Sequence, residues 1–525
     1  MSKCRSLKYV IRIGALVIVL LATVQAQAQY LNPWYTSYQI QNVGEAPTDI
    51  HVDYYDSEGI LQGSASLVYP AVPVGGSVTV IQKTDDPNLD TGRFSAVIYA
   101  DQNIAGIANQ QLLPSAPEAL TPIAPFSSYA GETSGSRTVI LPVVMYNWFG
   151  YYTEIFIQNV DFETAANVNI TYYPTTIEGQ IAGAEGVTDN SNTIPPYAAL
   201  HKSQKNMTEL GAGQILSGSI MIDGRWKGRF LGAAVIESDK PIVVVVNQHQ
   251  VSDVKLFTYN GFSSGARKIV APIYMRGHYG YYASLTIANT SLEASANVTV
   301  TYNADNTYSK PVANQGKSVS AHFVIPPGES INRYDGPPAS DDQSDLDDEV
   351  AFTQFFGTVV IESDQPVVAI INQEAIKAGD AQAGTYSALD VNKATTKVSA
   401  PLIQANFFAY YTSLTIQSAT GATGDVYISY TSDGYYSSVL NVSKTYHHTI
   451  IGAAPLNIYE GTKGGIQIGD IVTDPATWAD SSGNIRFIGS AIITSTVPIV
   501  AFVNEEKDIL GVDSMYTFNA FNMQP

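Results

Sequence analysis

The chain has 525 residues, of which 45% are apolar and 14% charged, with 33 tyrosines, one cysteine and a formal net charge of −20. This apolar content is enough to build buried cores, so the composition excludes a disordered protein. The 27 basic residues against 47 acidic ones leave no positive field for phosphate backbones, which excludes nucleic acid as a partner. At about 100–200 residues per domain, the length predicts about three to five domains.

Residues 1–28 are typical of a signal peptide. A basic start is followed by twelve apolar or small residues, Ile13 to Val24, and by the motif Ala26-Gln27-Ala28. Twelve helical residues reach about 18 Å against a hydrocarbon layer of about 30 Å, so we expect cleavage near Gln29 and no membrane span in the mature chain. Cys4 and four basic residues leave with this leader, which excludes disulfides and changes the net charge to −24. We therefore expect a secreted protein, extracellular or at the cell surface.

Four copies of one sequence pattern follow in chain order. Each begins with a strand-like alternation that ends at a turn residue, and a second alternating stretch ends at a tyrosine twelve or thirteen residues later. Alternation with β-branched residues predicts strands that have one buried face. The turn residues are Asn42, Asn159, Asn289 and Ser418, at steps of 117, 130 and 129 residues, and the tyrosines are Tyr54, Tyr172, Tyr302 and Tyr430.

A third element closes each copy. Two apolar stretches flank a polar segment with Ser, Asp and Pro, as from Phe230 to Asn247, and the first copy keeps the spacing without the proline. This pattern predicts a hairpin with a polar turn. An asparagine ends the second apolar stretch, where we expect its amide to satisfy backbone groups that leave the sheet. These asparagines are Asn109, Asn247, Asn372 and Asn504.

The repeats predict an all-β chain of four tandem antiparallel β-sandwich modules, immunoglobulin-like in size and strand density. We expect them to lie end to end, as a rod on the order of 150 Å long. Residues 114–137, rich in Pro, Ser, Gly and Ala, predict a flexible linker after the first module. The predicted modules span 29–113, 138–262, 268–389 and 397–525.

The shared frame also carries a resemblance. It runs Tyr-Tyr-Thr-x-Leu-x-Ile-x-Asn, then Val-x-Val-x-Tyr, then Ile-Pro-Pro-Gly as at Ile325 to Gly328, then Glu-Ser-Asp-x-Pro. This frame resembles the tandem immunoglobulin-like β-sandwich repeat modules of exported bacterial cell-surface proteins, and it covers nearly all of the mature chain. The resemblance implies the fold and the location, and it brings no catalytic residues.

Two patterns that could carry chemistry lack their usual context. Gly261 to Gly265 matches the G-x-S-x-G pattern of hydrolases, but a strand is predicted after it where a helix is required, so we favour a linker turn. The seven histidines have no spacing typical of metal sites, and adjacent His447 and His448 on a strand would point to opposite faces. The sequence nominates no catalytic residue and predicts a protein that is not an enzyme.

Two acidic loops are weak candidates for calcium, the one cofactor considered. Oxygen ligands at alternate positions suit Ca²⁺, but neither loop has a complete EF-hand pattern, so a solvated loop is the favoured interpretation. The candidate ligands are Asp86, Asn88 and Asp90 in the first module and Asp345, Asp347 and Glu349 in the third.

An aromatic cluster opens each module. Flat aromatic faces can stack on sugar rings, and they can also fill the joints between modules. Because the cluster recurs at one position of the repeat, packing is favoured, since a binding site would more often be confined to one copy. The candidate contacts with glycan or partner are Trp34, Trp148, Tyr151, Tyr281 and Tyr410.

Together these features predict a non-enzymatic extracellular protein with a structural or adhesive role, forming a rod at the cell surface, in a sheath or in a filament. Its partners would be other protein subunits or cell-surface glycans, and self-association stays open. A glycan-binding module array is the main alternative, and a hydrolase with its site at a module joint is the second. Exposed aromatics on one face would favour glycan binding, whereas burial at the joints would favour packing.

Overall fold

The computed structural model is all-β with antiparallel sheets, which confirms the all-β part of the predicted fold class. The only helices among the residues that it describes are one-turn segments, such as α1 (Gln82–Asp85) and α2 (Pro475–Trp478). The structure describes residues 16–22, 34–112, 126–175, 186–204, 220–222, 225–227, 230–250, 255–337, 345–347, 352–376, 382–452, 454–463, 466–507 and 515–523.

The first repeat forms two four-stranded sheets, ordered β1-β6-β3-β4 and β5-β2-β7-β8. Its strands are β1 (Leu16–Ala22), β2 (Trp34–Asn42), β3 (Thr48–Tyr55), β4 (Leu61–Val72), β5 (Ser77–Ile81), β6 (Phe94–Ala100), β7 (Ile104–Leu112) and β8 (Phe126–Ala130).

The second repeat forms a seven-stranded sheet in which the long strand β16 is central and a separate small hairpin joins β14 to β15. Its strands are β9 (Ser136–Tyr146), β10 (Tyr151–Asn159), β11 (Ala166–Pro174), β12 (Val187–Ile194), β13 (Ala199–Ser203), β14 (Ile220–Ile222), β15 (Arg225–Lys227), β16 (Phe230–Gln250) and β17 (Leu256–Asn260).

The third and fourth repeats each form an eight-stranded sheet with the same strand order. The third holds β18 (Ala266–His278), β19 (Tyr281–Asn289), β20 (Ala296–Ala304), η2 (Val312–Asn314), β21 (Ser318–Ile325), β22 (Ser330–Asp335), η3 (Asp345–Asp347), β23 (Phe355–Ala375), β24 (Ala383–Ser387), β25 (Leu389–Asp390) and η4 (Val391–Lys393). The fourth holds β26 (Thr395–Phe407), β27 (Tyr410–Ser418), β28 (Gly424–Ser432), β29 (Ser443–Ile450), β30 (Leu456–Tyr459), β31 (Gly461–Lys463), β32 (Ile466–Ile468), β33 (Phe487–Lys507), β34 (Tyr516–Asn519) and β35 (Phe521–Asn522).

The hairpin predicted for the third element is wrong. β16, β23 and β33 are continuous strands of 21 residues, and in the first repeat β6 and β7 lie in different sheets. The first half of β16 pairs with β11 and its second half with β10. Pro241 lies where these partners change, so the proline removes no hydrogen bond from a regular ladder. The polar segment that resembles a turn is the exposed middle of a strand that crosses between two sets of partners.

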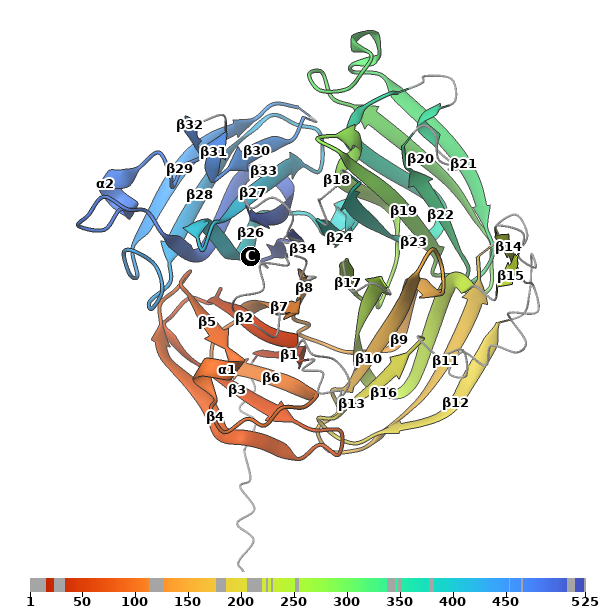
Figure 1. Cartoon of the computed structure of the whole chain (residues 1–525), viewed down its shortest axis with the longest axis horizontal. Helices are drawn as coiled ribbons and strands as arrows, with labels where there is room; N and C mark the ends of the chain where they lie inside the picture. The colour runs from red at the N-terminus through yellow and green to blue at the C-terminus, as the bar shows by residue number, and fades with distance from the viewer. Residues whose placement is uncertain are drawn as a thin grey trace, which may run out of the picture.

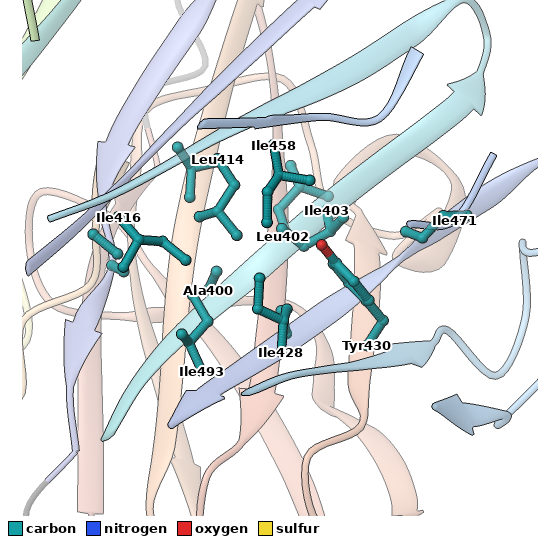
Figure 2. Packing of buried hydrophobic residues seen from close by; sticks show 14 of the residues in the cluster. Ala400, Leu402, Ile403, Leu414, Ile416, Ile428, Tyr430, Ile458, Ile471 and Ile493 are labelled. Atoms are coloured by element: carbon teal, nitrogen blue, oxygen red, sulfur yellow. The ribbon is translucent and has the colours of Figure 1, made fainter. Parts of the chain in front are cut away.

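The alternating strands bury one face, as predicted. The four repeated tyrosines have exposed fractions of at most 1%. Figure 2 shows the core of the fourth repeat, where Leu414 and Ile416 of β27 pack with Ile428 of β28 and Ile493 of β33. Burial of these aliphatic side chains stabilises each repeat by roughly 1.5–3 kcal/mol per side chain.

The four repeats close into a ring, so the end-to-end rod predicted from the sequence is wrong. Figure 1 shows them following one another around an axis, with β8, β17, β24 and β34 at the centre. β8 contacts both β17 and β34, which joins the first repeat to the second and to the fourth. β8 also lies inside the stretch expected to be a flexible linker, where it pairs with β7. A linker composition did not prevent residues 126–130 from forming an axial strand.

Two of the four repeated asparagines, Asn247 and Asn372, connect neighbouring repeats, which corrects the local backbone role expected for them. The Nδ2 of Asn247 donates to Oε1 of Gln110 at 2.8 Å, and its Oδ1 accepts from Thr258 at 2.8 Å. One repeat further on, Nδ2 of Asn372 donates to Oε1 of Gln248 at 3.0 Å, and Oδ1 accepts from Thr385 at 2.7 Å. We call this set of contacts the axial seam.

The joint between the first and fourth repeats is also polar. Ser399 donates to the Oε1 of Gln41, whose Nε2 donates to the carbonyl of Gly75 at 2.9 Å. The hydroxyl of Ser490 reaches the same carbonyl at 2.8 Å. Buried amides and hydroxyls therefore lock the last joint of the ring with specific pairs.

The predicted leader contributes strand β1, which pairs with β6 over seven residues. Ile18 of β1 lies opposite Ile98, at the position where β9, β18 and β26 pair in the later repeats. A cleavage near Gln29 would remove β1 and leave this edge of β6 without that partner.

Replacing Asn372 by alanine should weaken the ring. The substitution leaves the Oε1 of Gln248 and the hydroxyl of Thr385 without the amide, and unsatisfied buried polar groups cost about 1–3 kcal/mol. We expect this loss in the free energy of unfolding measured with urea. Asn306→Ala, at an exposed position of the same repeat, is the matched control. An effect of Asn372→Ala no larger than that of the control would contradict the role of the seam.

Glu505→Gln should make the protein more stable than the wild type, and the difference should increase as the pH rises. Glu505 stands where the other repeats have Gln110, Gln248 and Gln373, and its buried Oε2 has no hydrogen-bond partner among the described residues. Burial raises its pKa well above the usual value. Because the folded state therefore holds the proton more tightly, stability is greatest below the unfolded pKa of about 4.3 and falls as the pH rises.

We expect the variant to gain roughly 1–3 kcal/mol over the wild type at pH 8, and the difference to shrink toward pH 4. Urea unfolding at several pH values measures it. A difference that does not change with pH would show that the carboxyl proton is not responsible.

Candidate functional site

Three hairpin tips carry an exposed aromatic residue in a strained backbone conformation. The tips join β9 to β10, β18 to β19 and β26 to β27 through two-residue turns in which both φ angles are positive, as in a type I′ turn. Such turns favour Asn-Gly, but the first turn residue here is Phe149 (φ 47°), Tyr279 (φ 51°) or Phe408 (φ 49°). A left-handed conformation costs a residue with a Cβ about 1–2 kcal/mol.

The three rings face solvent. Their exposed fractions are 68% for Phe149, 65% for Tyr279 and 67% for Phe408, and each ring makes an edge contact with the aromatic residue before it. The following tyrosine lies opposite the end of the long strand in each repeat, as Tyr151 does opposite Gln250. Because these ends are equivalent around the axis, the tips lie on one face of the ring. We call Phe149, Tyr279 and Phe408 the aromatic crown.

The aromatics proposed from the sequence lie beside the crown or at the joints. Trp34 is 8% exposed and contacts His249 of the second repeat edge-on at 5.5 Å. Tyr151 donates to Glu374 of the third repeat at 3.5 Å. The other three, Trp148, Tyr281 and Tyr410, are half-buried. In the clusters that contain Trp148, Tyr281 and Tyr410, the most exposed ring is that of the turn residue, which has a positive φ.

The acidic candidates in the first repeat are divided between a buried and an exposed position. Asp86 is 1% exposed and accepts from the backbone N–H and hydroxyl of Ser64. Asn88 donates to the same hydroxyl at 3.0 Å, and Asp90 is exposed. Asp86 thus accepts hydrogen bonds that fix Ser64 of β4 in place. A calcium ion at Asp86 would have to compete with the two donors of Ser64.

The acidic candidates in the third repeat also include a structural residue. Asp345 is 3% exposed, accepts from the hydroxyl of Tyr302 at 2.9 Å and pairs with Arg333. Asp347 lies in η3, and Glu349 falls outside the described residues. Within the described ranges, no three His, Cys, Asp or Glu side chains are grouped so as to hold a metal ion.

A polar cavity of about 270 Å³ lies at the axis, opposite the crown, and Ser263 and Ser264 of the G-x-S-x-G pattern line it. The pattern lies in a turn between β17 and β18, so a strand follows it, as predicted, and not a helix. Glu132 also lines this cavity and accepts from Asn260 at 2.9 Å. Burial raises the pKa of Glu132 to about 7, so this carboxyl exchanges its proton near neutrality.

The crown residues should be replaceable by asparagine without loss of stability. Asparagine tolerates a positive φ, so the triple variant Phe149→Asn, Tyr279→Asn and Phe408→Asn relieves strain that offsets the lost edge contacts, worth about 0.5–1.5 kcal/mol each. We expect an unfolding free energy in urea that is unchanged or raised by up to about 1 kcal/mol per turn. A loss at each turn would instead assign the rings a packing role.

The chain was compared with known proteins. No model of a known protein family matches it, and a search of curated proteins found no match. No helix in the described part of the chain has the length and apolar character needed to cross a membrane.

Proposed function

We propose that this chain is a non-enzymatic extracellular protein with a structural or adhesive role, exported by its leader. In this proposal the four repeats are immunoglobulin-like β-sandwich units that act together as one disc. The resemblance of the repeat frame to exported cell-surface modules and the excess of acidic residues support this assignment. The aromatic crown is the surface through which the disc would attach to its partner.

The observation that supports the proposal most is the conformational free energy that the positive φ angles of the crown residues cost. Two-residue turns of this kind form most easily with Asn-Gly, yet three repeats place a large exposed ring there, at a conformational cost. Strain of this kind persists where the surrounding structure over-determines it, and it clusters at functional sites. Although Arg486 lies over the Phe408 ring, each of the three side chains is about two-thirds exposed, and contact with a partner is the role that explains this exposure best.

Neutral glycans are the partner class that the crown favours. Exposed aromatic faces can stack on the apolar face of a sugar ring. The net charge of −20 repels acidic polymers. Three equivalent rings around one axis would also bind a repeating polymer with several contacts at once, which raises its apparent affinity.

Sedimentation of the mature protein with insoluble neutral polysaccharides, such as cellulose and chitin, tests this proposal. We expect the triple asparagine variant of the crown to bind at least roughly tenfold more weakly than the wild type. Val324→Asn changes an apolar side chain of equal exposure, 65%, outside the crown and should leave binding unchanged. Equal binding by the wild type and the triple variant would contradict a role for the crown, and no binding by the wild type would contradict the choice of neutral glycan.

A further inference from the structure

A second cavity lies between the first and second repeats and has a volume of about 420 Å³. This volume falls within the range of about 300–1,000 Å³ that is usual for small-molecule sites. Its walls are mostly apolar, with Phe94 of β6, Phe156 of β10 and Leu200 of β13 among them. Its basic side chains come from both repeats, Arg93 from the first and His201 from the second.

Most N–H donors of the Arg93 guanidinium are not used by the described part of the chain. Its Nη1 donates to Nδ1 of His201, and no other partner of the guanidinium is found among the described residues. The side chain is half-buried beside an apolar cavity, where charge-assisted hydrogen bonds are stronger than in water. A planar guanidinium with free donors is suited to bind a carboxylate through two parallel hydrogen bonds.

His201 is held in place behind Arg93. Its Nε2 lies 3.3 Å from Oε1 of Glu154, and its ring stacks on Phe156 with 4.7 Å between ring centres. Because a guanidinium can only donate, Nδ1 of His201 accepts from Arg93, and Nε2 lies near the carboxylate without a hydrogen bond to it. The stack on Phe156 therefore holds the His201 ring where its Nδ1 can accept from Arg93.

The charge of Glu154 is balanced on its other side. Glu154 is 5% exposed, and its Oε2 lies 2.9 Å from Nε2 of His249. Burial alone would raise the pKa of Glu154, but its contacts with His249, and secondarily with His201, hold the pKa well below the usual value. The carboxylate is thus ionised and oriented by histidines, so it does not compete for the free donors of Arg93.

The cluster occurs in one repeat only. The positions equivalent to Glu154, each paired with the repeated asparagine, hold Ser37, Ser284 and Ser413. The other three repeats fold with serine there, so the fold does not require the cluster. A feature that one copy adds to a shared scaffold is more naturally explained by a ligand than by packing.

Asp56 is the other charged residue on the cavity wall, and its carboxylate serves its own loop. It accepts from the backbone N–H groups of Glu58 and Ile60 at 3.0 and 2.9 Å, and from Nε2 of Gln62. These donors leave Arg93 as the available charged group of the cavity. One cation beside an apolar wall matches a ligand with a single carboxylate and an apolar body.

We propose that this cavity binds a small monocarboxylate, with its carboxylate on Arg93 and its apolar part against Phe94, Phe156 and Leu200. This site is separate from the aromatic crown and does not depend on the proposed adhesive role. The ligand class follows from one planar cation beside an apolar wall.

Isothermal titration calorimetry on the mature protein tests the site with hexanoate and benzoate as probes, and with hexanamide, benzamide, phosphate and sulfate as comparison compounds. We expect saturable binding of the two carboxylates below about 10 mM, with the amides and inorganic anions at least roughly tenfold weaker. Arg93→Gln should lose at least roughly tenfold in carboxylate affinity. Arg137→Gln removes the same charge from an exposed position of β9 and should change nothing.

Leu200→Trp provides a second variant, because the larger side chain fills the cavity while Arg93 itself is not substituted. This variant should also abolish binding. The triple crown variant should bind both carboxylates normally. The proposal is overturned if neither carboxylate binds, if the amides or inorganic anions bind equally well, or if a folded Arg93→Gln or Leu200→Trp variant keeps wild-type affinity. Far-ultraviolet circular dichroism establishes that each variant is folded.

Discussion

The ring depends on side chains that cross from one repeat to the next, and the axial seam is one set of them. Each repeat has its own apolar core, and each core also takes in side chains of a neighbouring repeat, as the core of the first takes in Phe156 and Val245 of the second. Apolar contacts therefore cross the joints together with the polar ones. At the axis, Asn247 and Asn372 each reach back to a glutamine of the preceding repeat and are held by a threonine of the next axial strand. Buried amides need these partners, and a rod would leave them unpaired.

The seam also positions the surfaces to which function is assigned. Because the long strands pass the axis in equivalent orientations, the hairpins that pair with their ends present Phe149, Tyr279 and Phe408 on the same face. The same closure brings Arg93 of the first repeat against His201 of the second. A crown of rings and a pocket at a joint therefore both follow from the ring, and neither would exist in an isolated repeat.

The sequence predicted the strands well because period-two alternation reports one-sided burial directly. Tyr54, Tyr172, Tyr302 and Tyr430 are buried at the positions that the alternation indicated. It could not distinguish a hairpin from a crossing strand, because Ser, Asp and Pro suit both a turn and an exposed strand segment. The alternation could not predict the ring, because the pairing of Asn247 with Gln110 joins residues of separate repeats. The glycine and proline content of residues 114–137 likewise predicted a flexible linker, whereas part of this stretch forms strand β8.

The surroundings of the candidate site residues depend on features that the sequence does not carry. The aromatic clusters were evident, but which ring is exposed depends on backbone conformation, as the contrast between Tyr151 and Phe149 shows. A bulky residue before Gly150 or Gly280 in a two-residue turn is a signal that could have been used. Comparison of the repeats could also have identified Glu154, which replaces a serine in one copy. The contact of Arg93 with His201 had no sequence signal, because it crosses a joint.

Small-angle X-ray scattering of the mature protein in solution tests the closed ring most directly. A compact chain of this length should have a radius of gyration of roughly 24 Å. A rod of four sandwiches on the order of 150 Å long would give roughly 43 Å and a pair-distance distribution with a long tail. We expect the compact value with a single symmetric peak. A radius near the larger value would contradict the ring, and with it the seam and the shared face of the crown.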